Sequence, residues 1–247
     1  MSVRKATETE ILKERDLDSL PHRALRLQKI ESYKIHFVPN IRAFDYAREA
    51  KHSYINGFFR SSIICSSIVV EQSFMHELIG ASEDWEETYW KIQVKKMTFG
   101  KLLEEVKKKK VKKLKPFIKD AERLKEVRNE VAAHPTYISD YFELEDRYQL
   151  IWANRTMFRD IRRLLRCLTP QKRKEIEKSK IIVKSSEGKK IRESKCLEDF
   201  LSNPKKTEVE TFFNWWTFEH GLLGELALEA YGRMAKIVNG LYHRKDA

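Results

Sequence analysis

Cysteine is scarce in this 247-residue sequence, which contains only Cys65, Cys167 and Cys196. No two of them form a CxxC pair, and no histidine stands near any of them. A disulfide framework and a zinc site are therefore not expected, and a reducing compartment fits this cysteine usage. The sequence also offers no convincing cluster of His, Cys, Asp and Glu for a metal ion. We therefore expect neither a metal nor another cofactor.

Long hydrophobic runs are also missing. The most apolar stretch, residues 63–70, is interrupted by Ser66 and Ser67 and is far too short to span a bilayer. Residues 1–18 are charged throughout and contain no apolar signal core. These absences predict a cytoplasmic protein without a membrane segment.

Positive charge is what the sequence has in excess. The formal net charge is +12, charged residues make up 35% of the chain, and hydrophobic residues make up 41%. The hydrophobic share suffices for a core, whereas the net charge predicts a polyanionic partner, of which nucleic acid is the commonest. A lysine-rich protein from a hot environment is the alternative interpretation of the same composition.

Helical periodicity begins in the first half of the chain, over residues 23–37 and then from Asn40 onward. Asn40 is suited to cap the second of these helices, and the Asn56-Gly57 pair is suited to end it. Residues 58–80 are apolar on more than one face, which predicts a central helix that forms a helical hairpin with the one before it. The apolar stripe of the second helix is expected to comprise Ile41, Phe44, Ala47, Ala50 and Tyr54.

The helical pattern continues at Thr98 and runs into a segment with seven lysines between Lys107 and Lys115. Pro116 suits the first turn of the next helix. Helix is also expected over residues 141–168 and from Thr207 to the end. Between them, residues 181–183 and Ile191 flank a Ser-Ser-Glu-Gly segment, which is compatible with a small β-hairpin.

These patterns predict an all-α fold with four parts. They are an N-terminal helical extension (1–38), a core (39–137), an additional helix with a peripheral insertion that holds the β-hairpin (138–206), and C-terminal helices that close the bundle (207–247).

The helix that follows Pro116 carries Arg128 and Asn129 and is stopped by Pro135, directly after His134. Arginine is permanently charged and forks onto phosphate oxygens, and histidine moves protons near neutral pH. In an unbroken helix, six residues separate Arg128 and His134 by roughly 240°, so they would not share a face. The residue before a proline is pushed out of the α region, which gives the imidazole a route towards the guanidinium.

This segment resembles the Rx4–6H signature of HEPN domains, in which a polar residue such as Asn usually follows the arginine. Five residues separate Arg128 from His134 here. Residues 46–71 are similar to the family's opening helical hairpin, residues 98–102 to the start of its third helix, and residues 227–242 to its closing helix.

The resemblance implies a HEPN-like antiparallel helical bundle that forms a homodimer with a composite active site. It further implies a metal-independent endoribonuclease that cleaves single-stranded RNA. His134 would act as general base or acid, Arg128 would clamp the phosphate, and Asn129 would orient the histidine or contact the RNA backbone. Attack by the ribose 2′-OH would distinguish RNA from DNA.

Other functions remain open from the sequence. A HEPN module without catalytic activity would dimerise and bind nucleic acid or a protein partner, and a purely structural dimerisation bundle is a third interpretation. The resemblance also implies a defence or toxin–antitoxin setting, with an antitoxin or a nucleotidyltransferase as a partner.

Two further residues could support the site. Glu71, in the apolar second helix of the hairpin, either pairs with Arg128 or tunes His134, or it belongs to a structural ion pair. Tyr137 stands three residues after His134, whereas the toxin branch of the family carries a modifiable tyrosine two residues after the histidine. A packing or phosphate-contacting tyrosine is therefore the favoured interpretation.

The lysine-rich segment between Lys107 and Lys115 precedes the helix that carries Arg128, which we call the motif helix. This lysine run is a candidate for holding the RNA backbone by charge. A solvated turn is the alternative, because charge runs usually are solvated. The candidate RNA-binding residues are Lys107, Lys108, Lys109, Lys110, Lys112 and Lys113.

Overall fold

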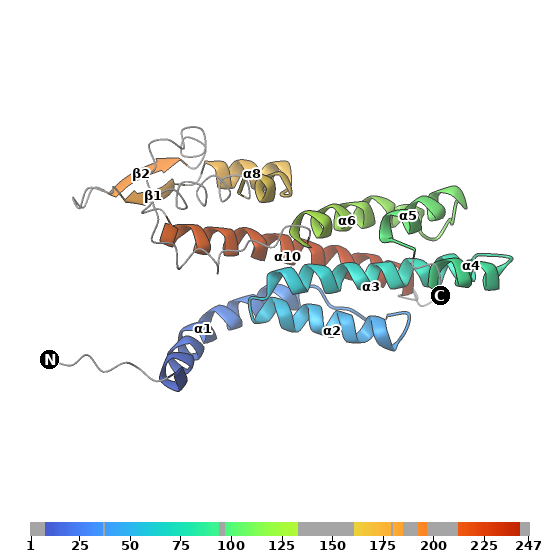
Figure 1. The fold of residues 1–247 in the computed structure, drawn as a ribbon, viewed down its shortest axis with the longest axis horizontal. Helices are drawn as coiled ribbons and strands as arrows, with labels where there is room; N and C mark the ends of the chain where they lie inside the picture. Colours follow the sequence, from blue (N-terminus) through green and yellow to red (C-terminus); the bar gives the residue numbers. More distant parts are fainter. Residues whose placement is uncertain are drawn as a thin grey trace. The chain divides into compact units, whose positions relative to one another are not determined.

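The protein is described by a computed structural model, predominantly helical, that covers residues 8–36, 38–93, 97–132, 161–178, 180–184, 192–196 and 212–242 (Figure 1). The chain divides into two compact units. The first comprises residues 1–125 and 227–247, and the second comprises residues 126–226. The four-part organisation expected from the sequence stays a prediction.

The first unit contains the N-terminal helices, and its first helix differs from the expected one. That helix begins before Pro21 and ends at Glu31, whereas the sequence predicted helix over residues 23–37. Pro21 removes one backbone donor without ending the helix. The unit is built from α1 (Glu8–Glu31), α2 (Ile41–Ile55), α3 (Phe59–Gly80), α4 (Trp85–Gln93), α5 (Phe99–Lys108), η1 (Lys115–Phe117), most of α6 (Ile118–Ala132) and the last part of α10 (Phe212–Tyr242).

Helices α2 and α3 form the predicted hairpin and lie side by side (Figure 1). The Asn40 side chain accepts a hydrogen bond from the Ala43 N–H at 2.8 Å, which confirms the predicted N-cap. At the other end, Gly57 adopts a φ of 82°, and the Phe58 N–H donates to the Ser53 carbonyl at 2.8 Å. Glycine reaches this left-handed conformation without a Cβ penalty, so the Asn56-Gly57 stop is confirmed as well.

Helix α3 is central to the first unit, because it contacts α2, α4 and α5. Its buried residues include Ser62, Ser66, Ser67 and Ser73. The Ser62 hydroxyl donates across the hairpin to the Ala50 carbonyl at 2.9 Å. Ser67 and Ser73 donate to carbonyls one turn earlier in α3. The small side chain of Ser62 thus lies between the two helices with its hydroxyl satisfied.

The buried stripe of α2 differs from the predicted one. Ile41 is 81% exposed and Phe44 is 54% exposed, although both were expected in the core. The physical reason is the close approach to α3, which favours small side chains at the contact. The buried residues of α2 are Ala43, Ala47, Ala50, Ser53 and Tyr54.

The connection from α5 to α6 is an ordered turn. Thr98 caps α5 by accepting from the Lys101 N–H at 3.4 Å. After α5, Lys110 adopts a φ of 52°, and the Val111 N–H reaches back to the Val106 carbonyl at 3.4 Å. This is a Schellman closure with a lysine where glycine is usual. Pro116 lies in the 3₁₀ turn that leads into α6, as predicted for a first-turn proline.

A network of charges ties the beginning of α6 to α10. The Asp120 carboxylate, in a residue only 8% exposed, accepts hydrogen bonds from Arg233 and from Lys236, the latter at 2.7 Å. Glu229 accepts from Arg233 at 2.9 Å and from Arg123 at 3.1 Å. Each buried carboxylate is thereby matched by cations.

The second unit holds the end of α6, a helical segment at residues 161–166, helix α8 (Pro170–Glu177), a two-stranded sheet and the first part of α10. Strands β1 (Lys180–Lys184) and β2 (Arg192–Cys196) pair antiparallel, with Ile182 opposite Ser194. They fall in the region where the sequence suggested a hairpin. That this region is an insertion into a HEPN-like bundle stays a prediction.

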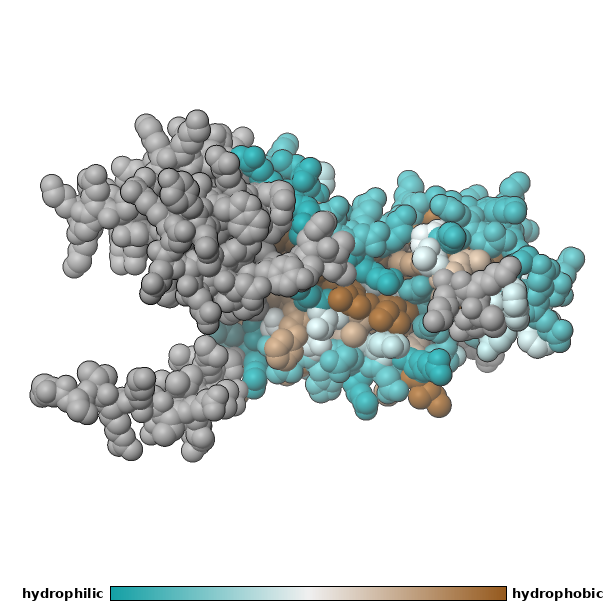
Figure 2. Space-filling view, in the orientation of Figure 1, coloured by the Kyte–Doolittle hydropathy of each residue, from teal (hydrophilic) through white to brown (hydrophobic). Residues whose placement is uncertain are grey.

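The described surface is largely hydrophilic in the view of Figure 2, with apolar side chains exposed in limited areas. Within the described part of the chain, no helix combines the length and the apolar character that a membrane span requires.

Gly240 lies so close to the Phe117 ring that a larger residue would not fit without a shift. A Cβ at this position would overlap the Phe117 ring, whereas a Cβ at Gly221 of the same helix would have no neighbour within 4 Å. We expect Gly240→Ala to lower the free energy of unfolding by about 1 kcal/mol, because overpacking outweighs the gain in helix propensity. Gly221→Ala, the matched control, should raise it by about 0.5–1 kcal/mol. Urea unfolding measures both values, and equal effects would contradict the close approach.

Removing the Asp120 carboxylate should leave Arg233 and Lys236 without their shared partner. We expect Asp120→Ala to lower the free energy of unfolding by about 2 kcal/mol, because the partly buried Arg233 then loses its compensation. Asp45→Ala is the control, since Asp45 pairs with Arg48 at 3.4 Å with both side chains more than half exposed. The control should change the free energy of unfolding by less than about 0.5 kcal/mol. Comparable losses in the two variants would show that the network does not hold α6.

Candidate nucleic-acid site around Arg128

Arg128 occupies a position in α6 that would otherwise be apolar. It follows Leu124 by four residues and precedes Val131 by three, so it shares their helix face. Both neighbours are buried, and Arg128 itself is half-buried. Arginine binds anions such as phosphate through its planar fork of donors, which makes Arg128 a candidate for such a role.

The two residues after Arg128 face different surroundings. Asn129 is exposed, so its amide is accessible from solvent. The Glu130 carboxylate lies 3.2 Å from Nε of Arg163, whose side chain is only 11% exposed. This ion pair joins the end of α6 to the helical segment 161–166 within the second unit. The backbone beside Asn129 is therefore held by a contact to a distant part of the chain.

The arginines of residues 161–166 are functional candidates that the sequence analysis missed. Arg162 and Arg166 are exposed and four residues apart, so they share one face of their helical turn. Arg163 points instead to Glu130. The cluster is visible in the sequence as Arg-Arg-Leu-Leu-Arg, but only the Glu130–Arg163 pair shows that it neighbours the motif helix.

His134 and Tyr137 lie outside the described residues, so the approach of His134 to Arg128 stays a prediction. Glu71 is described as a half-buried residue of α3 in the first unit. Its pairing with Arg128 or His134 stays a prediction as well. Of the three expected catalytic residues, the structure therefore describes Arg128 and Asn129.

Three lysines of the run between α5 and α6 have partners within the protein. The Lys107 ammonium lies 2.6 Å from the Glu122 carboxylate. Lys109 donates to the hydroxyls of Ser82 and Thr88 at 3.0 and 3.1 Å. These contacts tie the turn to the segment before α4, to α4 and to α6.

The third anchored lysine is Lys113, which lies 2.9 Å from the Glu77 carboxylate and 5.2 Å from the centre of the Tyr242 ring. Burial, followed by the nearby Glu77, raises the pKa of Tyr242, so its hydroxyl is neutral at physiological pH. The Lys113 ammonium is thus stabilised both by the Glu77 carboxylate and by the face of the Tyr242 ring.

The other nominated lysines remain available to a ligand. Lys108, Lys110 and Lys112 are exposed and form no ion pair with any described residue. An ordered basic turn with exposed ammonium groups can attract a phosphate backbone through counterion release. Three of the six candidate lysines thus have partners within the protein, and RNA binding by the run stays a prediction.

Comparison with known proteins returned no matching family model, no matching curated protein and no matching solved structure. In the described ranges, no group of three or more His, Cys, Asp and Glu side chains is placed to hold a metal ion.

The Glu130–Arg163 pair should measurably stabilise the second unit. We expect Arg163→Ala to lower the free energy of unfolding by about 1–2 kcal/mol, because the nearly buried guanidinium loses both its packing and its carboxylate. Arg166→Ala, an exposed control from the same helical segment, should cost less than about 0.5 kcal/mol.

A double-mutant cycle with Glu130→Ala isolates the pair. It should give a coupling of roughly 0.5–1 kcal/mol, since Glu130 is partly exposed. A coupling of zero would mean that the pair does not hold the end of α6.

Proposed function

We propose that this protein is a metal-independent endoribonuclease of the HEPN type that cleaves single-stranded RNA. The observation that carries the proposal is the half-buried Arg128 in the apolar stripe of α6, followed by the exposed Asn129 and then, along the chain, by His134. A guanidinium at this position, next to an exposed amide, presents the planar fork of donors that suits phosphate oxygens.

In the proposed reaction, the ribose 2′-oxygen attacks the adjacent phosphorus, and the bond from phosphorus to the 5′-oxygen of the next nucleotide breaks. His134 accepts the 2′ proton or donates a proton to the leaving 5′-oxygen. Arg128 neutralises the charge that develops on the phosphate. The products are a 2′,3′-cyclic phosphate and a 5′-hydroxyl.

A homodimer with a composite active site is part of this proposal. The reaction needs one group that accepts a proton and one that donates a proton. A second copy of the motif across a two-fold interface would supply the group that the first His134 does not.

Exposed cations in each of the two units support an RNA substrate. Lys108, Lys110 and Lys112 project from the basic turn, and Arg162 and Arg166 belong to the segment that Glu130 anchors. Such groups bind phosphates without reading sequence, and they steer a polyanion to the protein. A defence or toxin–antitoxin setting, with an antitoxin or nucleotidyltransferase partner, is proposed on the family resemblance alone.

A non-catalytic HEPN module is the second candidate function. The spacing that favours it is the interval of five residues between Arg128 and His134, one more than the commonest interval in the family. An extra residue rotates the imidazole by about 100° if it is helical. Such a protein would bind RNA or a protein partner through the same surface without cleaving RNA.

Cleavage of a single-stranded RNA by the purified protein in EDTA tests the proposal. We expect cyclic-phosphate products, no cleavage of the same sequence as DNA, and a loss of rate of about 10²-fold or more in Arg128→Ala and in His134→Ala. Arg42→Ala and His52→Ala are matched controls, because both residues are exposed on α2. They should leave the rate unchanged.

RNA binding without cleavage by the wild-type protein would replace the nuclease with the non-catalytic module. Cleavage that survives both motif substitutions would reject Arg128 and His134 as the catalytic pair and point to a contaminating nuclease.

A further inference from the structure

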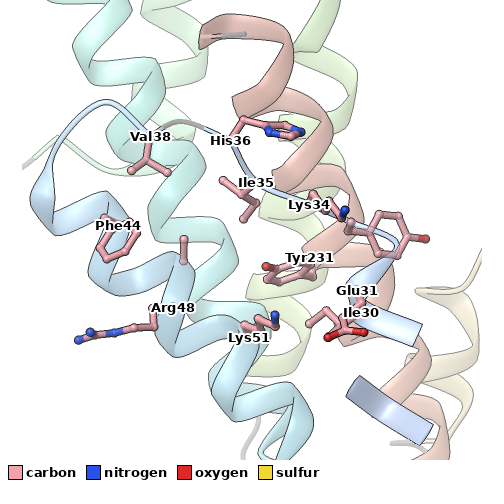
Figure 3. A pocket seen from close by; sticks show the side chains of 12 residues that line it. Ile30, Glu31, Lys34, Ile35, His36, Val38, Phe44, Arg48, Lys51 and Tyr231 are labelled. Atoms are coloured by element: carbon pink, nitrogen blue, oxygen red, sulfur yellow. The ribbon is translucent and has the colours of Figure 1, made fainter. Parts of the chain in front are cut away.

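A pocket of about 840 Å³ opens in the first unit between the end of α1, the segment after it, α2 and α10 (Figure 3). This volume lies in the range of small-molecule sites in proteins. None of the residues proposed above for RNA cleavage or RNA binding lines it. It is therefore a feature separate from the proposed nuclease site.

The walls of the pocket are mainly apolar. Ile30, Ala47 and Tyr231 are buried and form its inner surface, whereas Phe44 is 54% exposed at its edge. Phe44 was expected in the core and lines this pocket instead. An exposed aromatic ring beside a concave apolar surface is a feature of ligand sites rather than of solvated helix faces.

The charges around the pocket are predominantly positive. Lys34, Arg48 and Lys51 line it, against the single carboxylate of Glu31. Arg48 is partly neutralised by Asp45 at 3.4 Å, and in Figure 3 it extends away from the pocket. Lys34 and Lys51 form no ion pair with any described residue.

Lys51 is the cation best placed to bind a ligand. It is half-buried on α2, and Figure 3 shows it pointing into the pocket together with Tyr231. Burial raises the pKa of Tyr231 to about 12. A partly desolvated ammonium without a carboxylate partner gains from an anionic ligand.

We infer that this pocket binds a small amphipathic anion, whose apolar part lies against Phe44 and Tyr231 and whose carboxylate, phosphate or sulfonate pairs with Lys51. The apolar walls of the pocket and the positive charge of Lys51 together select an amphipathic anion as the ligand. A neutral apolar ligand would leave the ammonium unpaired, and a fully hydrated anion would leave the apolar walls uncovered. The inference does not depend on the proposed nuclease activity.

A pair of fluorescent probes tests the charge requirement with the full chain. The anionic probe is 8-anilinonaphthalene-1-sulfonate, and the neutral one is N-phenyl-1-naphthylamine, which has the same rings without the sulfonate. We expect the anionic probe to bind at one site per chain and Lys51→Met to weaken it about tenfold. Neutral-probe binding should be unchanged in this variant. Arg42→Met, a cation of α2 outside the pocket, should bind both probes like the wild type.

Displacement of the bound probe tests the ligand class and its source. Octanoate is compared with 1-octanol, and adenosine 5′-monophosphate is compared with adenosine. Displacement by either anion but not by its neutral counterpart supports the inference and identifies an acyl or an aromatic body. Failure of both anions to displace the probe overturns it, as does anionic-probe binding that is insensitive to Lys51→Met.

Filling the pocket provides a second test that does not involve charge. Ala47→Leu places a larger side chain on the inner wall. We expect anionic-probe binding to fall by at least about fivefold, with helical circular dichroism and cooperative unfolding retained. If Ala47→Leu disrupts folding, Phe44→Ser at the exposed edge takes its place. Unchanged probe binding in a folded variant would show that the probe binds elsewhere.

Discussion

The charge network at Asp120 is the interaction on which the placement of the motif helix depends. Helix α6 begins at a 3₁₀ turn beside a lysine-rich loop, where the Phe117 ring lies close to Gly240 of α10. The Asp120 carboxylate binds two cations of α10, and Arg123 and Glu229 extend the network by a further pair. Because hydrogen-bonded ion pairs require particular distances and angles, they hold α6 at one rotation.

That rotation decides which face of α6 is buried. Along the helix, Leu124 and Val131 are buried, Arg128 is half-buried and Asn129 is exposed. The Glu130–Arg163 pair then holds the far end of the same helix within the second unit. The proposed phosphate contact of Arg128 would gain from a helix held in this way, since ordering a mobile segment on binding costs entropy.

Local signals in the sequence predicted helix ends well and buried faces less well. Asn40, Gly57 and Pro116 were assigned correctly because capping and turn chemistry depend on only a few neighbouring residues. Phe44 was assigned to the core on its hydrophobicity. The close packing of α2 against α3 selected small residues there and left its ring at the edge of a pocket.

The sequence by itself determined the helical character of the chain, its main helix ends and the order Arg128, Asn129, His134, because these follow from residue type and short-range spacing. Tertiary structure alone decided which lysines are anchored, which carboxylate holds α6, and that Lys51 shares a pocket with Tyr231. These pairings join residues that lie far apart along the chain. Their partners are selected by three-dimensional distance and burial, which no local pattern encodes.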